Sequence, residues 1–134
     1  MANVINRTTV KALIEKDGKV LILKDEKGVW ELPGGKIDNS ESEEETLRRE
    51  LNEELGIENA KIGQKIHTFD FEVNFKDTLF QFHAIVRLCE IDEQSLVISP
   101  EHSEIKWIEI EDIKNYKMRE GYAEAVAKYQ KEYL

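Results

Sequence analysis

The first third of the chain alternates between short apolar runs and turn residues. Apolar and β-branched residues dominate Arg7 to Lys16 and Val20 to Leu23, with Asp17-Gly18 between the two runs. Two such runs around an Asp-Gly pair predict a β-hairpin. Val29 to Leu32 forms a further short extended segment, and Pro33-Gly34-Gly35 predicts a loop directly after it.

The next segment has the pattern of a capped amphipathic helix. Ser42 and Glu45 have the spacing of a capping box, in which each residue satisfies a backbone N–H of the other. Gly56 is a natural C-terminal stop. The sequence therefore predicts a helix from Glu43 to Leu55. A spacing of four places three of its leucines on one apolar stripe: Leu47, Leu51 and Leu55.

The second half of the chain consists mainly of strand patterns and ends in a helix pattern. Three consecutive segments have strand character: Ile57–Ile66, His67–Phe75 and Leu79–Ile91. Ser99 to Ser103 predicts a loop, and the alternation from Ile105 to Ile110 predicts a strand. Arg119 to Tyr133 predicts an amphipathic helix that packs on the sheet. This order predicts one α/β domain over residues 1–134, with a mixed sheet between two helices.

Composition narrows the classes of protein that this domain can belong to. The chain has 134 residues, and 19 Lys and Arg against 28 Asp and Glu give a net charge of −9. This acidity argues against binding to a nucleic acid polymer. No apolar run approaches the roughly 20 residues that cross a bilayer. The single cysteine, Cys89, lies in an apolar run, so we expect a buried thiol in a cytoplasmic protein.

Acidic residues concentrate on the predicted helix. At about 100° per residue, Glu50, Glu53 and Glu54 share a rim beside the leucine stripe. Carboxylates at these spacings repel one another, and Arg49 offsets only part of that repulsion. A hard divalent cation such as Mg²⁺ or Mn²⁺ would relieve the remainder. The alternative is a solvated acidic face, which is the commoner role of a Glu-rich helix.

Histidines and phenylalanines give weaker indications. His67, His83 and His102 have no ligand-like spacing to one another, so we expect no direct role for them. Five phenylalanines at strand spacing predict core packing, with stacking of one or two on a nucleobase as the alternative: Phe69, Phe71, Phe75, Phe80 and Phe82.

The whole segment from Gly35 to Ile57 resembles the Nudix box, whose pattern is G-x5-E-x7-R-E-U-x-E-E-x-G-U, where U is a bulky aliphatic residue. The chain matches every fixed position, with Gly35, Glu41, Arg49, Glu50, Leu51, Glu53, Glu54, Gly56 and Ile57. The preceding Trp30 to Lys36 is similar to the family's usual approach to the box. The resemblance implies the family's α/β/α sandwich with a mixed β-sheet.

The resemblance also implies roles for individual residues. Metal ligands would be Glu50, Glu53 and Glu54, together with the carbonyl of Gly34. Glu41 and Arg49 would brace the loops around the helix, and Gly35 and Gly56 would form the tight turns. The general base is less fixed in the family. Within the box it would be Glu50 or Glu53, and from a later loop it would be Glu104 in preference to Glu101.

The implied activity is metal-dependent hydrolysis of a diphosphate linkage in a small nucleotide. The lead-in to the box resembles the MutT-like branch, which implies conversion of a nucleoside triphosphate to a nucleoside monophosphate and pyrophosphate. The alternative substrate is a nucleoside diphosphate linked to another group, as in ADP-ribose, a nucleotide sugar or a dinucleoside polyphosphate. A non-catalytic nucleotide-sensing module is a further alternative, although such modules typically lose box glutamates. An isoprenoid diphosphate isomerase would need a cysteine in its active site, whereas Cys89 lies in a predicted core strand. Many family members are homodimers, so a homodimer is one of the states that the resemblance allows.

Overall fold

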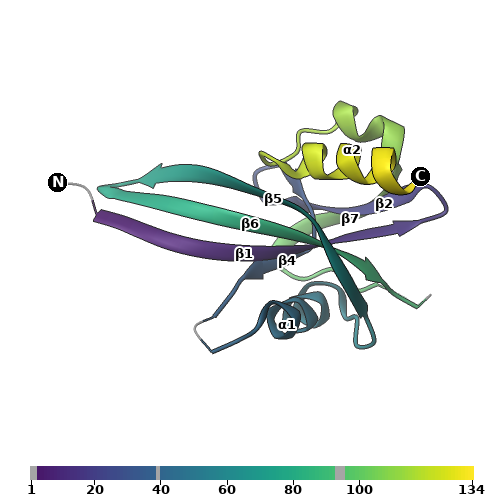
Figure 1. Ribbon diagram of the computed structural model, residues 1–134, viewed down its shortest axis with the longest axis horizontal. Helices are drawn as coiled ribbons and strands as arrows, with labels where there is room; N and C mark the ends of the chain where they lie inside the picture. Colours follow the sequence, from purple (N-terminus) through teal and green to yellow (C-terminus); the bar gives the residue numbers. More distant parts are fainter. Residues whose placement is uncertain (1–2, 39, 93–95) are drawn as a thin grey trace.

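The computed structural model describes residues 3–38, 40–92 and 96–134 (Figure 1). Their elements follow in this order: β1 (Asn3–Lys16), β2 (Lys19–Asp25), β3 (Trp30–Glu31), β4 (Gly34–Lys36), α1 (Glu43–Leu55), β5 (Lys61–Phe75), β6 (Thr78–Glu90), β7 (His102–Glu109), a 3₁₀ helix (Ile110–Asn115) and α2 (Tyr122–Tyr133).

The strands form one mixed sheet that lies between the two helices. Its main path runs β3-β2-β1-β6-β5, while β4 pairs with β1 and β7 pairs with β2. The long β1–β6 ladder is parallel, and β5 pairs with β6 in the antiparallel sense. Figure 1 shows α1 on one side of the sheet and α2 on the other. The predicted α/β/α sandwich is therefore confirmed.

Two apolar cores lie on opposite faces of the sheet. On the α2 side, Leu13 and Val86 pack with residues of α2. On the α1 side, Val10, Ala12 and Ile14 pack with the three helix leucines. Adjacent residues of β1 thus serve opposite cores, which is why this strand reads as a nearly continuous apolar run. Within the described residues, no helix is long and apolar enough to span a membrane.

The ends of α1 have the predicted chemistry. The Ser42 hydroxyl accepts from the Glu45 N–H at 3.1 Å, and the Glu45 carboxylate accepts from the Ser42 N–H at 2.9 Å. Gly56 adopts φ 71°, a left-handed conformation that lets its N–H return to the Asn52 carbonyl at 2.9 Å. The leucine stripe is fully buried. This helix is confirmed at the predicted boundaries.

Several other boundaries differ from the prediction. Residues 61–75 form the single strand β5 and not parts of two strands, because irregular register at Ile62–Lys65 and Lys65–His67 bends it without ending it. The predicted hairpin pairs only next to its turn, after which β1 joins β6 and β4 while β2 joins β7. Strand β7 starts at His102, within the predicted loop. Helix α2 starts at Tyr122, and the sequence did not predict the 3₁₀ helix.

Candidate active site

The site forms where the C-terminal half of α1 meets β4. Glu54 is buried, with 6% of its surface exposed. Its Oε1 accepts a hydrogen bond from the Gly34 N–H at 2.8 Å. Burial raises the pKa of Glu54 to about 7, although the Lys11 ammonium and the Gly34 N–H act in the opposite direction. A carboxylate is thus held at the start of β4, in an environment that favours its protonation.

Glu50 lies one helical turn earlier and packs against the second glycine of β4. A Cβ atom on Gly35 would lie 2.6 Å from the Glu50 carboxylate, so any other residue here would force that carboxylate to shift. Burial raises the pKa of Glu50, while the Arg49 guanidinium lowers it. The first two residues of β4, Gly34 and Gly35, therefore bring backbone into contact with two box carboxylates.

Arg49 connects the loop before the helix to the helix itself. Its guanidinium donates to both carboxylate oxygens of Glu41, at 2.8 and 3.0 Å, and Thr46 donates to the same carboxylate at 2.9 Å. The hydrogen bonds from Arg49 lower the pKa of Glu41 to about 2, against an opposing effect of desolvation. The bidentate contact is the geometry expected of the predicted brace.

Glu53 is placed differently from its two box partners. Its side chain is 57% exposed, and its carboxylate accepts from Arg49 at 3.2 Å. Among the residues that the structure describes, no three Asp, Glu, His or Cys side chains lie where they could hold one ion together. Glu50 and Glu54 nevertheless provide the hard oxygen donors that Mg²⁺ prefers, next to the backbone of β4. The donor chemistry fits a divalent cation, provided that Glu53 leaves Arg49 to join it.

Three groups that the sequence did not indicate lie close to Glu54, of which Lys11 and His102 are buried and Glu31 is partly buried. The Lys11 ammonium donates to Glu31 at 3.0 Å, and Nε2 of His102 lies 3.1 Å from the other Glu31 oxygen. The same His102 nitrogen lies 3.8 Å from Glu54. Although burial opposes it, the Lys11 charge and the His102 hydrogen bond lower the pKa of Glu31 to about 2. The hydrogen bond to Glu31 likewise raises the pKa of His102. His102, from which we expected no direct role, thus belongs to the surroundings of the site.

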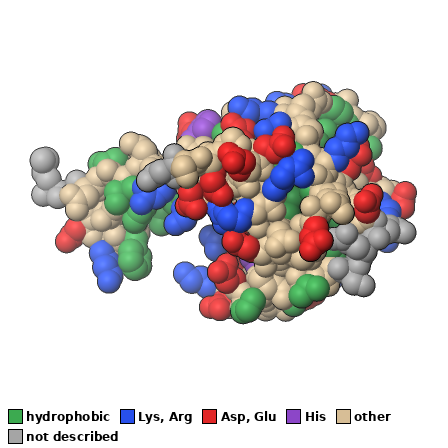
Figure 2. All heavy atoms as spheres, turned by 90° about the horizontal axis from the view of Figure 1, so that it is seen from below, with side chains coloured by type: hydrophobic (Ala, Val, Ile, Leu, Met, Phe, Trp, Pro, Cys, Tyr) green, Lys and Arg blue, Asp and Glu red, His purple; other side chains and the backbone are tan. Residues whose placement is uncertain are grey.

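An open cleft of about 630 Å³ lies above these groups. Glu50, Glu54, Glu31 and His102 line it on the side of the α1 loop, and phenylalanines of β5 and β6 line it on the other side. Figure 2 shows hydrophobic side chains gathered on the projecting part of the sheet, across a hollow from charged side chains of the body. Three further cations line the same cleft: Arg7, Lys36 and Arg119.

The phenylalanines correct the prediction of core packing. Only Phe69 packs against a core cluster. Phe75 is 61% exposed, and the rings of Phe71 and Phe82 stack with centroids 4.8 Å apart in the wall of the cleft. Strand spacing places all these rings on one face of the sheet, but that face extends beyond the body of the domain, where no helix covers it.

The two loop glutamates occupy different environments. Glu101 lines the cleft. Glu104 forms an ion pair with Lys24 at 3.1 Å and is not among the residues that line the cleft. The choice of Glu104 as general base stays a prediction. Of the two glutamates, Glu101 is the better placed to contact a substrate in the cleft, because it is the one that lines the cleft.

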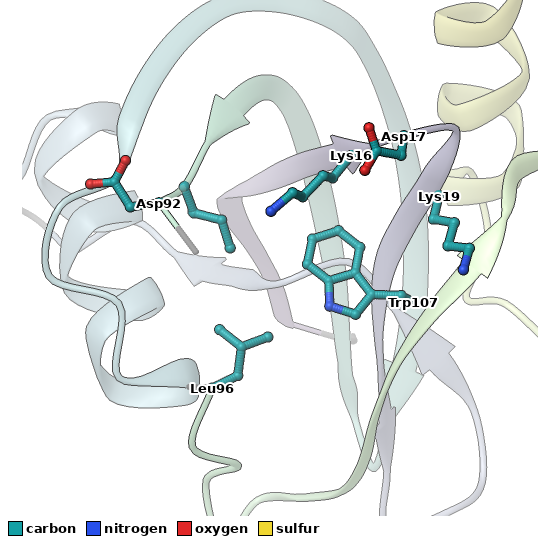
Figure 3. A pocket seen from close by; sticks show the side chains of 7 residues that line it. Lys16, Asp17, Lys19, Asp92, Leu96 and Trp107 are labelled. Carbon is teal, nitrogen blue, oxygen red and sulfur yellow. The ribbon is translucent and has the colours of Figure 1, made fainter. Parts of the chain in front are cut away.

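A second hollow, of about 450 Å³, lies elsewhere and is lined by none of the box carboxylates. Figure 3 shows the Trp107 ring between the side chains of Lys16 and Lys19. Because this hollow lacks the oxygen ligands of the box, the first cleft is the candidate active site.

Comparisons with known proteins identify the family of the chain. The family model of the NUDIX domain matches residues 5–129. The CTP pyrophosphohydrolase of Escherichia coli (strain K12) is 44% identical over 70 residues, which span 48% of this chain and 51% of that protein. Nucleoside triphosphatase NudI of Escherichia coli O139:H28 (strain E24377A / ETEC) is 32% identical over 123 residues, covering 82% of this chain and 86% of that protein. The crystal structure of the MutT protein from Methanosarcina mazei Go1 superposes with a TM-score of 0.83, at 26% identity and 98% coverage of both chains.

The fold and the similarity to these proteins are those of a pyrophosphohydrolase. With a match over nearly its full length, the chain belongs to the Nudix family.

Proposed function

We propose that the protein hydrolyses a nucleoside triphosphate to a nucleoside monophosphate and pyrophosphate, with Mg²⁺ or Mn²⁺ held by Glu50, Glu53, Glu54 and the Gly34 carbonyl. One observation carries this proposal: two box carboxylates, Glu50 and Glu54, and a wall of stacked phenylalanines line the same cleft. The carboxylates suit a metal-bound phosphate chain, and the phenylalanines suit the flat ring of a nucleobase.

The chemistry follows from charge and position. A bound divalent cation would offset the negative charge of the phosphate chain and make a bound water easier to deprotonate. Arg7, Lys36 and Arg119, which line the cleft, would attract the remaining phosphate charge. Glu50 or Glu53 in the box, Glu104 of β7 or Glu101 just before β7 would accept the proton of the attacking water.

The similar proteins support a triphosphate over a substituted diphosphate. The relatives of known activity reported above are a CTP pyrophosphohydrolase and a nucleoside triphosphatase. ADP-ribose, nucleotide sugars and dinucleoside polyphosphates are the competing substrates that an activity test must include.

The test is hydrolysis of a nucleotide panel by the purified chain, with and without Mg²⁺. The panel holds ordinary and oxidised nucleoside triphosphates and the three competing substrates, with products identified by mass. We expect metal-dependent release of a monophosphate and pyrophosphate from a triphosphate. Glu44→Gln is the matched control for substitutions of the box glutamates, such as Glu54→Gln. Glu44 lies on the same helix but pairs with Arg48 at the surface. Absence of turnover in folded protein that binds Mg²⁺ would contradict the proposal and favour a sensing module.

We also propose a cytoplasmic location, since Cys89 is a free, buried thiol whose burial raises its pKa to about 12. The homodimer that the family resemblance allows stays untested, and light scattering on the purified chain would test it.

A further inference from the structure

Lys11 is a cation in the interior of the protein. Only 5% of its surface is exposed, and its neighbours Val10 and Ala12 are fully buried. In the part of the chain that the structure describes, it is the only buried Lys or Arg. Burying an ammonium group costs free energy unless the group is paired and hydrogen-bonded. The contacts of Lys11 therefore indicate which negative charges it neutralises.

The contacts of Lys11 connect it to the box. In the β1–β4 ladder, Lys11 lies directly opposite Gly34. Its ammonium donates to Glu31 at 3.0 Å and to the Gly34 carbonyl at 3.3 Å, and lies 5.6 Å from the centre of the Tyr122 ring. The N–H of the same Gly34 donates to Glu54 at 2.8 Å. One glycine residue is thus held by a fixed cation at its carbonyl and by a box carboxylate at its N–H.

We propose that Lys11 is a built-in cation that sets how tightly the box carboxylates bind a divalent metal ion. The inference rests on the metal site of the proposed function. The ammonium occupies one acceptor position of the Gly34 carbonyl and neutralises Glu31, which would otherwise add negative charge to the cleft. An incoming divalent cation meets a fixed positive charge in a partly buried place, where such repulsion is strong.

The expected consequence is weak metal binding in the absence of substrate. The phosphate chain of a substrate brings negative charge that interacts favourably with both the ion and the ammonium. Lys11 therefore favours the joint binding of ion and substrate over binding of the ion alone.

The test measures Mn²⁺ binding, without substrate, from the electron paramagnetic resonance signal of free Mn²⁺. We expect Lys11→Met to bind Mn²⁺ on the order of tenfold more tightly than the wild type, because a fixed charge near the ion has been removed. Lys11→Arg keeps the charge and should stay close to the wild type. Lys36→Met is the matched control, because Lys36 lines the same cleft but is exposed, so solvent screens its charge.

A second comparison keeps the test valid if loss of the ammonium partner of Glu31 makes Lys11→Met misfold. Lys11→Met leaves Glu31 with only Arg119, at 3.7 Å, as a lysine or arginine partner, whereas Lys11→Met with Glu31→Gln removes both charges together. This double variant should bind Mn²⁺ about tenfold more tightly than Glu31→Gln alone. Circular dichroism and thermal unfolding without metal show which variants are folded.

The outcomes separate the inference from the function on which it rests. If the wild type binds Mn²⁺ and both comparisons show equal or weaker binding without Lys11, the role of Lys11 is wrong while the metal site stands. If neither the wild type nor any folded variant binds Mn²⁺, the metal site itself is wrong, and both proposals fail.

Discussion

Replacing Glu54 by Gln should stabilise the metal-free protein and at the same time abolish its activity. The folded protein binds a proton at Glu54 more tightly than the unfolded chain does, because burial raises the pKa from 4.5 to about 7. The stability from this proton is therefore fully present below pH 4.5 and is lost as the pH rises through 7. At about 1.4 kcal/mol for each pH unit, the loss reaches about 3 kcal/mol above pH 8.

Gln avoids this loss because it is neutral at every pH. It has the shape of Glu, and its side-chain oxygen can accept the Gly34 N–H that now bonds to the carboxylate. In urea denaturation with a chelator present, the stability advantage of Glu54→Gln should grow by about 2–3 kcal/mol between pH 5 and pH 8. The exposed control Glu44→Gln should show no such growth.

Addition of Mg²⁺ should reverse the order of stability at pH 8. An ion that binds only the folded wild type stabilises it by mass action, and the Gln variant lacks the ligand charge for this gain. Turnover of the best substrate should fall by orders of magnitude in the variant. An advantage that is the same at pH 5 and pH 8, or normal turnover by the variant, would refute the reasoning.

Three further substitutions test separate parts of the structure. Leu51→Ala removes a fully buried side chain and should lower stability by about 2–5 kcal/mol in urea denaturation; an unchanged midpoint would contradict its core position. Gly35→Ala places a Cβ 2.6 Å from the Glu50 carboxylate, so initial rates should fall at least about tenfold in protein that circular dichroism shows to be folded. Ser42→Ala removes the helix cap and should cost about 1 kcal/mol in thermal unfolding, with full turnover retained.

The features that sequence predicts well are local ones. Helix α1 has the predicted ends because its capping box, leucine stripe and final glycine act within a few residues of one another. The Arg49–Glu41 contact also follows, because the spacing of the box specifies both residues. The burial of both faces of the sheet was also predictable, because long apolar runs and two amphipathic helices require apolar contacts on both sides.

The features that sequence misses depend on contacts between distant segments. Lys11, Glu31 and His102 come from three separate strands, and no spacing between them indicates that they meet. The Phe71–Phe82 stack has the alternation of an ordinary strand, which is the same whether its face meets a core or a cleft. A lysine within an apolar run is the one available signal for the buried network, because a buried lysine requires a partner.

Arg49 shows why helix geometry alone gives an incomplete account of the carboxylates. A helical wheel places Glu50, Glu53 and Glu54 on one rim, yet Arg49 holds Glu53 at 3.2 Å and Glu50 at 3.0 Å. Arg49 therefore offsets the repulsion on the solvent side of the box, and the Lys11 charge, which acts to lower the pKa of Glu54, offsets it on the buried side. At the proposed metal site, a divalent ion would take Glu53 from Arg49 and would lie near the Lys11 charge. Differences in metal affinity between variants should thus follow changes in these two cations as closely as changes in the glutamates.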